Sequence, residues 1–178
     1  MRFVRRNTTE DRLQKLVRKI EATAKRDEER LRQAQEIGRR RASAALDLHT
    51  TCAAFVDSVN RLLPAPMLEL SPPAFSAESF RDPGSNVFQI NVSGRIVHIE
   101  FQATETPTSI EKFRIPYILE GSLRAFNQEL LDMSAIPEQL LFCCLDRNRL
   151  SWLWFNPRTQ QAAPLDEEHL IAVLDRLV

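Results

Sequence analysis

The stretch from Asn7 to Leu63 constrains the fold most, because it reads as helix for more than fifty residues, with no proline and a single glycine. Asn7 predicts an N-cap, with Glu10 three residues later, and Pro64 ends the run. A straight helix of this length would measure about 85 Å at ~1.5 Å per residue. The rest of the chain predicts a body with a radius of gyration of only ~13 Å. The helix therefore either pairs with another copy or breaks and folds back, most readily at Gly38.

Apolar residues are unevenly spread along this helix. Near its start, four of them step by four, three and four and so share one helical face: Leu13, Val17, Ile20 and Ala24. Residues 21–41 are mostly charged, whereas residues 44–63 carry a richer apolar face that predicts packing on a body. A second interpretation of residues 8–37, a loosely helical and frayed tail, stays open.

We therefore expect two parts, a basic helical arm at residues 1–43 and an α+β domain at residues 44–178. Inside the second part, residues 64–86 hold five prolines and form a connector. Leu68, Leu70 and Phe75 are expected to fix this connector to the body.

The zero net charge hides an asymmetry. Residues 1–41 hold 14 Lys/Arg and 7 Asp/Glu, a net +7, whereas residues 42–178 hold 10 and 17, a net −7. A basic arm can bind nucleic acid or dock on an acidic surface of this chain or a second copy. The interleaved acids and scarce aromatics weaken the nucleic-acid hypothesis. Its candidate residues are Arg2, Arg5, Arg6, Arg12, Lys15, Arg18 and Lys19, or the cluster Arg39, Arg40 and Arg41.

Other sequence signals point to a cytoplasmic protein without a cofactor. No apolar run is long enough for a membrane span, and the basic N-terminus lacks the apolar core of a secretory signal. The three cysteines, Cys52, Cys143 and Cys144, form no disulfide framework, and no Cys/His spacing fits zinc.

Two β-hairpins are predicted with their registers. Residues 87–92 and 95–103 flank a two-residue turn at Ser93-Gly94, and residues 140–145 and 150–155 are joined at residues 146–149. Slipping the first register by one residue would turn its apolar residues to the wrong face. The expected pairs are Phe88 with Ile99, Ile90 with Val97, Leu145 with Leu150, Cys143 with Trp152 and Leu141 with Trp154.

The elements around these hairpins complete the fold class. Residues 104–109 predict a loop, and residues 113–119 predict a third strand in which Pro116 implies an edge position or a bulge. Residues 122–133 show helical spacing, with a second hairpin arm as the alternative, and the last helix starts at Asp166. The class is α+β, with the order α-β-β-β-α-β-β-α: a long N-terminal helix, a candidate coiled coil, then an antiparallel sheet with helices packed on it.

This order of elements over residues 44–178 resembles that of the small dimeric type III secretion chaperones and related chaperone-like bacterial domains. The resemblance implies a dimeric, chaperone-like domain. It rests on element order, without a signature motif.

One strand carries a pattern that suggests chemistry. The string Val-His-Ile-Glu-Phe-Gln places His98, Glu100 and Gln102 on one strand face and resembles the strand motif of restriction-endonuclease-like nucleases. In such a nuclease, the Glu and the residue two positions later help to hold a divalent metal. An upstream Asp is also needed, and Asp82 is the nearest candidate, although it lies in a Pro/Gly loop and no Lys accompanies it. Alternating polar residues on a strand are more often a solvated face.

The leading hypothesis from the sequence is a non-enzymatic interaction protein. It would self-associate, as a dimer in the first instance, through the long helix or the sheet, and bind a protein or peptide partner. The doubly apolar strands at residues 140–155 favour a covered sheet or a subunit interface. Trp152 and Trp154 are expected to be core or interface aromatics, with ligand stacking as a minor alternative. The other hypotheses are a nucleic-acid-associated protein and a divalent-metal nuclease centred on Glu100.

Overall fold

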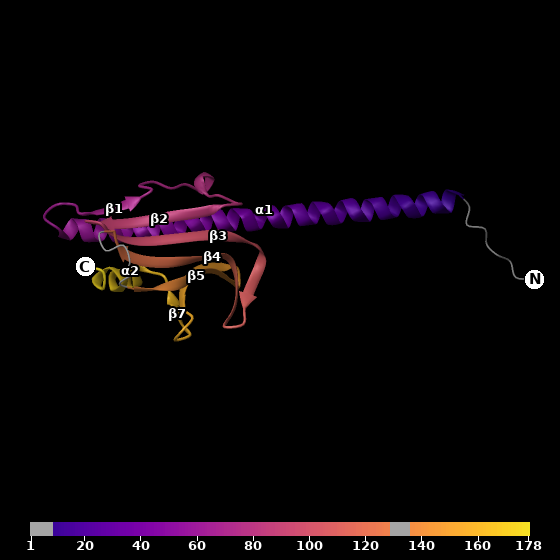
Figure 1. The fold of residues 1–178 in the computed structure, drawn as a ribbon. Coiled ribbons are helices and arrows are strands. Elements are labelled where there is room, and N and C mark those ends of the chain that lie inside the picture. Colours follow the sequence, from indigo (N-terminus) through magenta and orange to yellow (C-terminus); the bar gives the residue numbers. More distant parts are fainter. Residues whose placement is uncertain (1–8, 129–135) are drawn as a thin grey trace, which may run out of the picture. The chain divides into compact units, whose positions relative to one another are not determined.

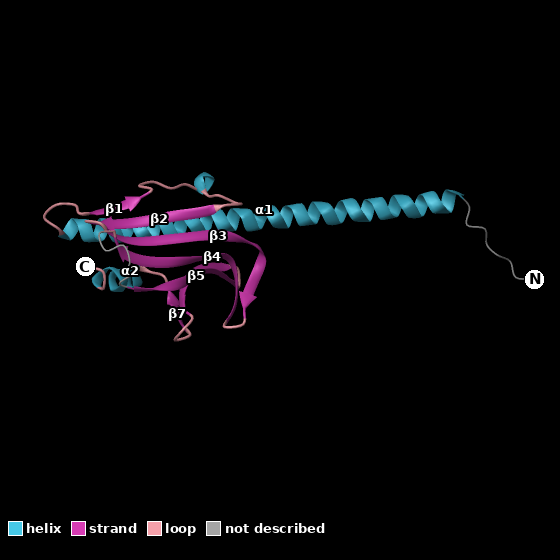
Figure 2. Ribbon diagram, viewed as in Figure 1, coloured by secondary structure: helices cyan, strands magenta, loops and turns pink. Residues whose placement is uncertain are grey.

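A computed structural model describes residues 9–128 and 136–178 and confirms the α+β class (Figures 1 and 2). The predicted N-cap at Asn7 and the cations Arg2, Arg5 and Arg6 lie outside these residues. The elements, in chain order, are α1 (Thr9–Leu62), β1 (Leu68–Ser71), the 3-10 turn η1 (Ala77–Ser79), β2 (Ser85–Val92), β3 (Arg95–Ile110), β4 (Phe113–Asn127), β5 (Ile136–Asp146), β6 (Arg149–Asn156), β7 (Gln161–Pro164) and α2 (Glu167–Asp175).

The helix α1 is continuous from Thr9 to Leu62, so of the two alternatives that the sequence left open, the break near Gly38 does not occur. A side chain on Gly38 would meet no atom within 4 Å, so no close packing requires a glycine there. Internal contacts divide the chain into two compact units, residues 1–38 and residues 39–178. Each unit contains one part of α1.

In the second unit, seven strands form one antiparallel sheet in which each strand pairs with the next along the chain. Ala44, Leu48, Cys52 and Phe55 of α1 are buried in one core with the apolar face of β2 and β3. The second half of α1 runs along these strands (Figure 1). The apolar side of α2 enters the same core, so both helices cover the same sheet face.

Both predicted hairpin registers are confirmed. Phe88 pairs with Ile99 and Cys143 pairs with Trp152. At the first turn Ser93 and Gly94 have φ of 51° and 84°, and at the second turn Arg147 and Asn148 have φ of 42° and 72°. Two consecutive positive φ values give the turn whose twist matches that of paired strands.

The expected order of elements is wrong between the two hairpins. Residues 104–109 continue β3 instead of forming a loop. Residues 122–127 continue β4, so the helix predicted there is wrong and the alternative, a strand, is the outcome. The rest of that predicted helix, residues 129–133, lies outside the described residues. β4 lies between β3 and β5, but its pairing with β5 begins at Tyr117, so Pro116 lies just outside that ladder. The pairing with β3 is irregular on both sides of Tyr117, as the alternative of a bulge predicted.

Because residues 122–127 form strand, the described order of elements no longer supports the chaperone resemblance, which rested on that order. The described sheet instead has six strands in succession after η1, and the sequence pattern did not predict β1 or β7. These two edge strands have four residues each.

Two side chains fix the ends of the helices. Asn60 accepts hydrogen bonds from the backbone N–H groups of Met67 (2.9 Å) and Leu68 (3.0 Å), and its amide donates to the Leu68 carbonyl (2.9 Å). The connector is thereby tied to the end of α1, and Leu68, Leu70 and Phe75 pack on the core as expected. Asp166 caps α2 by accepting from the backbone N–H of His169.

A smaller apolar cluster lies on the sheet face opposite the helices. Phe113 and Tyr117 of β4 meet Phe142 of β5, with ring centroids 4.5 and 4.4 Å from that of Phe142. Cys144 and Phe155 complete the buried part of the cluster. The tip of the β3–β4 hairpin bends out of the sheet (Figure 2). The second apolar face of strands β5 and β6 is thus partly covered by this chain itself.

Candidate functional site

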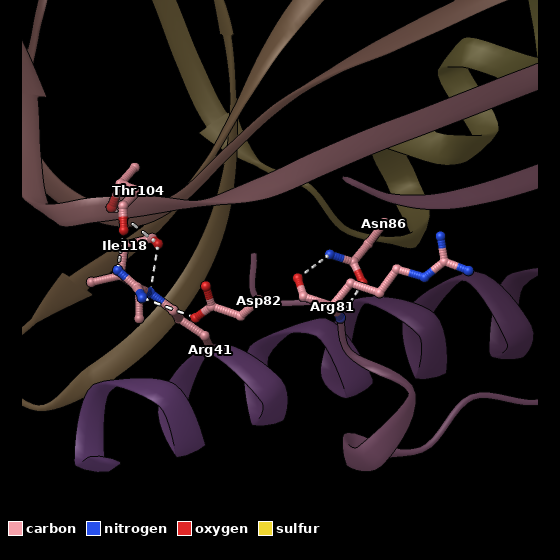
Figure 3. Close-up of polar contacts among 6 residues, drawn as sticks. All are labelled: Arg41, Arg81, Asp82, Asn86, Thr104 and Ile118. Atoms are coloured by element: carbon pink, nitrogen blue, oxygen red, sulfur yellow. Dashed lines mark hydrogen bonds and ion pairs between the residues drawn. The ribbon is translucent and has the colours of Figure 1, made fainter. Parts of the chain in front are cut away.

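The Arg39–Arg41 cluster is not one continuous basic surface, because Arg41 is buried. Its Nε donates to the carbonyl of Ile118 (3.2 Å), its Nη2 donates to the carbonyl of Thr104, and its Nη1 pairs with Asp82 (3.1 Å) (Figure 3). The guanidinium therefore joins α1 to β3, β4 and the loop that precedes β2. Arg39 is exposed.

A β-bulge in β4 explains why the Arg41 side chain stabilises this strand. Tyr117 and Leu119 face Cys144 and Cys143 of β5, with one extra residue, Ile118, between them. An extra residue in one strand interrupts the hydrogen-bond ladder. Arg41 and the hydroxyl of Thr104 (3.2 Å) donate to the Ile118 carbonyl. A buried carbonyl that the ladder leaves without a donor is thereby satisfied.

The loop carrying Asp82 is itself held in place. The side chain of Asn86, which is 5% exposed, accepts from the backbone N–H of Arg81 (2.9 Å) and donates to its carbonyl (3.1 Å) (Figure 3). These bonds fix the backbone next to Asp82, whose carboxylate points to Arg41. We call this network, formed by Arg41, Asp82, Asn86, Thr104 and Ile118, the clamp, because its bonds hold structural elements together.

The strand motif His98, Glu100 and Gln102 lies on the sheet face opposite α1, as its spacing predicted. Glu100 accepts a hydrogen bond from Ser85 (2.7 Å) and lies 3.4 Å from Arg124 and 3.6 Å from His98. The hydrogen bond from Ser85 is the main cause that lowers the pKa of Glu100. The carboxylate is therefore ionised at neutral pH and engaged with neighbouring side chains.

The structure gives Asp82 and Glu100 separate sets of partners. Asp82 pairs with Arg41, and Glu100 pairs with Ser85, His98 and Arg124. Within the described ranges, no three His, Cys, Asp or Glu side chains are grouped so that they could hold a metal ion. Asp82, the upstream carboxylate that the nuclease hypothesis requires, is thus paired with Arg41 and not with the side chains around Glu100.

A groove of about 450 Å³ opens beside Glu100 on this sheet face. Its volume falls within the usual range for ligand sites. Two carboxylates and no lysine or arginine are among its lining residues: Ser85, Glu100, Phe101, Gln102, Ile110, Tyr117, Glu120, Gly121, Ser122, Leu140 and Phe142. Burial first, and the nearby Glu120 carboxylate second, raise the pKa of Tyr117. Sequence reasoning missed Tyr117, Glu120 and Phe142, since only the sheet register brings them together.

The two tryptophans have structural contacts. Trp152 is 8% exposed, and its indole N–H donates to the Ala44 carbonyl (2.8 Å). Trp154 stacks on His169 with ring centroids 4.6 Å apart. His169 also bonds the side chain of Gln139 (2.7 Å), and burial lowers the pKa of its imidazole. Both tryptophans thus attach a helix to the sheet.

The first unit presents a different kind of surface. Its helix exposes a row of large apolar side chains: Leu13 is 56% exposed, Val17 52%, Ile20 59% and Leu31 61%. Leu13, Val17 and Ile20 share one helical face, as the sequence predicted. Single exposed apolar residues are common, but a contiguous row of them is typical of an interaction surface.

The described residues include no helix with a segment long and apolar enough to cross a membrane. Comparison with protein-family models, curated proteins and solved structures found no match to this chain.

Proposed function

We propose that this protein is a cytoplasmic, non-enzymatic interaction module that self-associates through the helix of its first unit. The observation that carries the proposal is that the exposed apolar side chains of Leu13, Val17, Ile20 and Leu31 fall on one four-three repeat of the first unit's helix, which is otherwise mostly charged. A helix that buries such a row against a second copy gains hydrophobic stabilisation that a solvated helix lacks.

The spacing of the row supports pairing with another helix. Positions alternate by four and three residues from Leu13 onward, and this alternation gives the 3.5-residue repeat of a coiled coil. The same spacing continues through Ala45, Leu48, Cys52 and Phe55, which are buried in the core of the second unit. The same four-three repeat is therefore buried against the sheet in the second unit and exposed to solvent in the first unit.

The groove on the sheet supports the second half of the proposal, binding of a protein or peptide partner. Aromatic and aliphatic side chains line it together with Glu100 and Glu120. A lining with two carboxylates and no cation favours a partner segment that places a lysine or arginine between apolar residues. A peptide array that compares such segments with their Lys-to-Glu counterparts tests this preference.

Self-association is tested by light scattering on the full chain at protein concentrations of about 1 to 100 µM. This range covers dissociation constants of about 1 µM and weaker, and 1 µM corresponds to a binding free energy of about −8 kcal/mol. The chain has a mass of 20.5 kDa, so a dimer has twice that mass. Ile20→Glu places a charge in the apolar row and should return the protein to the monomer. Ala22→Glu makes the same change on the outer helix face and should leave the dimer intact.

Two results would contradict the proposal. One is a monomeric native chain throughout this range of concentrations. The other is a dimer that Ile20→Glu and Ala22→Glu affect equally, because the apolar row would then have no part in it. The fluorescence of the two tryptophans, Trp152 and Trp154, both in the second unit, checks that both variants keep that unit folded.

A further inference from the structure

Eight positions of the first unit follow the four-three spacing without interruption. We call them the seam: Leu13, Val17, Ile20, Ala24, Asp27, Leu31, Ala34 and Gly38. The seam contains large, small and charged residues, and all of its positions from Leu13 to Ala34 are exposed. Because facing residues must fill the space between two helices, the order of these sizes restricts how a second copy can pack.

A parallel, in-register pair would place every seam residue opposite itself. Asp27 would then meet Asp27 of the second copy, and two carboxylates in one apolar layer repel each other and lose solvation. The adjacent Ala24 layer, and the Ala34 and Gly38 layers, would each bring two small side chains together. Half of the layers would therefore be charged or underpacked.

An antiparallel pair has a different set of facing residues. Reversing one helix also reverses the order of its four-residue and three-residue steps, and the steps of the two seams then coincide along their whole length. All eight positions are matched in one register, which pairs Leu13 with Gly38, Val17 with Ala34, Ile20 with Leu31 and Ala24 with Asp27 of the second copy.

This antiparallel register solves both problems of the parallel pair. Large residues meet small ones at the two outer layers of each end, and Ile20 meets Leu31, so fewer layers bring two small residues together than in the parallel pair. Asp27 faces Ala24, whose short side chain leaves the carboxylate room to reach water. Beside the seam, Leu16, which is 52% exposed, comes close to Ile37 of the second copy and extends the apolar contact.

One pair of flanking residues opposes the antiparallel register. Glu21 would lie near Glu28 of the second copy, and both are exposed. Repulsion between exposed like charges on helices costs only about 0.2–0.5 kcal/mol per pair. A buried carboxylate pair and several underpacked layers cost more, because a cavity the size of a methyl group alone costs about 1 kcal/mol. The seam therefore decides the direction.

We infer that two copies of this chain associate through residues 13–38 as an antiparallel two-stranded coiled coil, centred between Ala24 and Asp27. The inference rests on the self-association proposed above and specifies its geometry. In the dimer, the N-terminal end of the seam of each copy lies beside the C-terminal end of the other seam.

Disulfide crosslinking of full-length variants tests the direction. Val17→Cys and Ala34→Cys are each oxidised alone and as an equal mixture, and covalent dimers are measured by non-reducing electrophoresis. The native Cys52, Cys143 and Cys144 are buried. Burial raises the pKa of Cys52 and of Cys144 to about 12, so these thiols remain largely protonated and slow to oxidise.

The antiparallel geometry predicts covalent dimers in the mixture, at least tenfold more than in either variant alone. Efficient crosslinking of Val17→Cys with itself would show a parallel pair and overturn this inference while leaving self-association intact. Equal crosslinking in all three samples would show unspecific collision and would also overturn it. A monomer by light scattering would instead contradict the proposed function itself.

A second variant tests the charge at the flank. Glu28→Lys should strengthen the antiparallel dimer by turning the contact with Glu21 into an attractive one, lowering the dissociation constant about twofold to fivefold at low salt. In a parallel pair Glu28 lies near Thr23, and the constant should stay unchanged. An unchanged constant would contradict the antiparallel register.

Discussion

Replacing Arg41 by methionine should destabilise the second unit by about 3 kcal/mol, mainly because buried backbone carbonyls lose a hydrogen-bond donor. The change keeps an apolar stem and removes three donors. The Thr104 carbonyl loses its donor from Arg41, and an unsatisfied buried group costs about 1–3 kcal/mol. The Ile118 carbonyl keeps the Thr104 hydroxyl and loses less. The Asp82 carboxylate, at 34% exposure, recovers water and contributes least.

Urea unfolding followed by tryptophan fluorescence measures this loss. Trp152 bonds the Ala44 carbonyl of α1, so its emission reports the contact between helix and sheet inside the second unit. A loss of about 3 kcal/mol corresponds to a melting temperature about 6–12 °C lower for a chain of this size. Arg39→Met makes the same chemical change at an exposed site and should shift stability by less than about 0.5 kcal/mol. If Arg41→Met loses less than about 1 kcal/mol, the clamp does not hold the bulge.

Three further changes test other parts of the fold. Gly121→Ala should destabilise by more than about 3 kcal/mol in the same urea assay, since its Cβ would lie 2.1 Å from the backbone oxygen of Glu100; a loss below 1 kcal/mol would contradict this close approach. Asn60→Ala should cost about 1–3 kcal/mol, because the N–H of Leu68 loses its acceptor, and a wild-type midpoint would refute that role. Burial lowers the pKa of His169 in the folded protein. As the pH falls below about 6.5, the unfolded chain therefore binds more protons than the folded chain, and the free energy of unfolding decreases. His169→Gln should flatten this decrease, and an unchanged pH profile of stability would contradict the role of His169.

The sequence alone determined the pairing within both hairpins. Strand side chains alternate between faces, so a turn position together with one correct apolar pair, such as Phe88 with Ile99, fixes every other pair in the ladder. The end of α1 before Pro64 and the cap at Asp166 were also predictable, because proline chemistry and side-chain capping act within a few residues. The exposed apolar row on the first unit was visible for the same reason, as a local periodicity.

Other features depended on segments that are far apart in the chain. Residues 122–127 have helical spacing, yet they form strand because β3 and β5 provide hydrogen-bond partners on both sides of β4. The same long strands gather Tyr117, Glu120 and Phe142 into the groove. Arg41 looked like its exposed neighbour Arg39, and it is the distant carbonyls of Ile118 and Thr104 that give it buried acceptors. Local chemistry thus defined turns, caps and periodicity, whereas the tertiary structure decided which hydrogen-bond partners and which side-chain clusters each segment could reach.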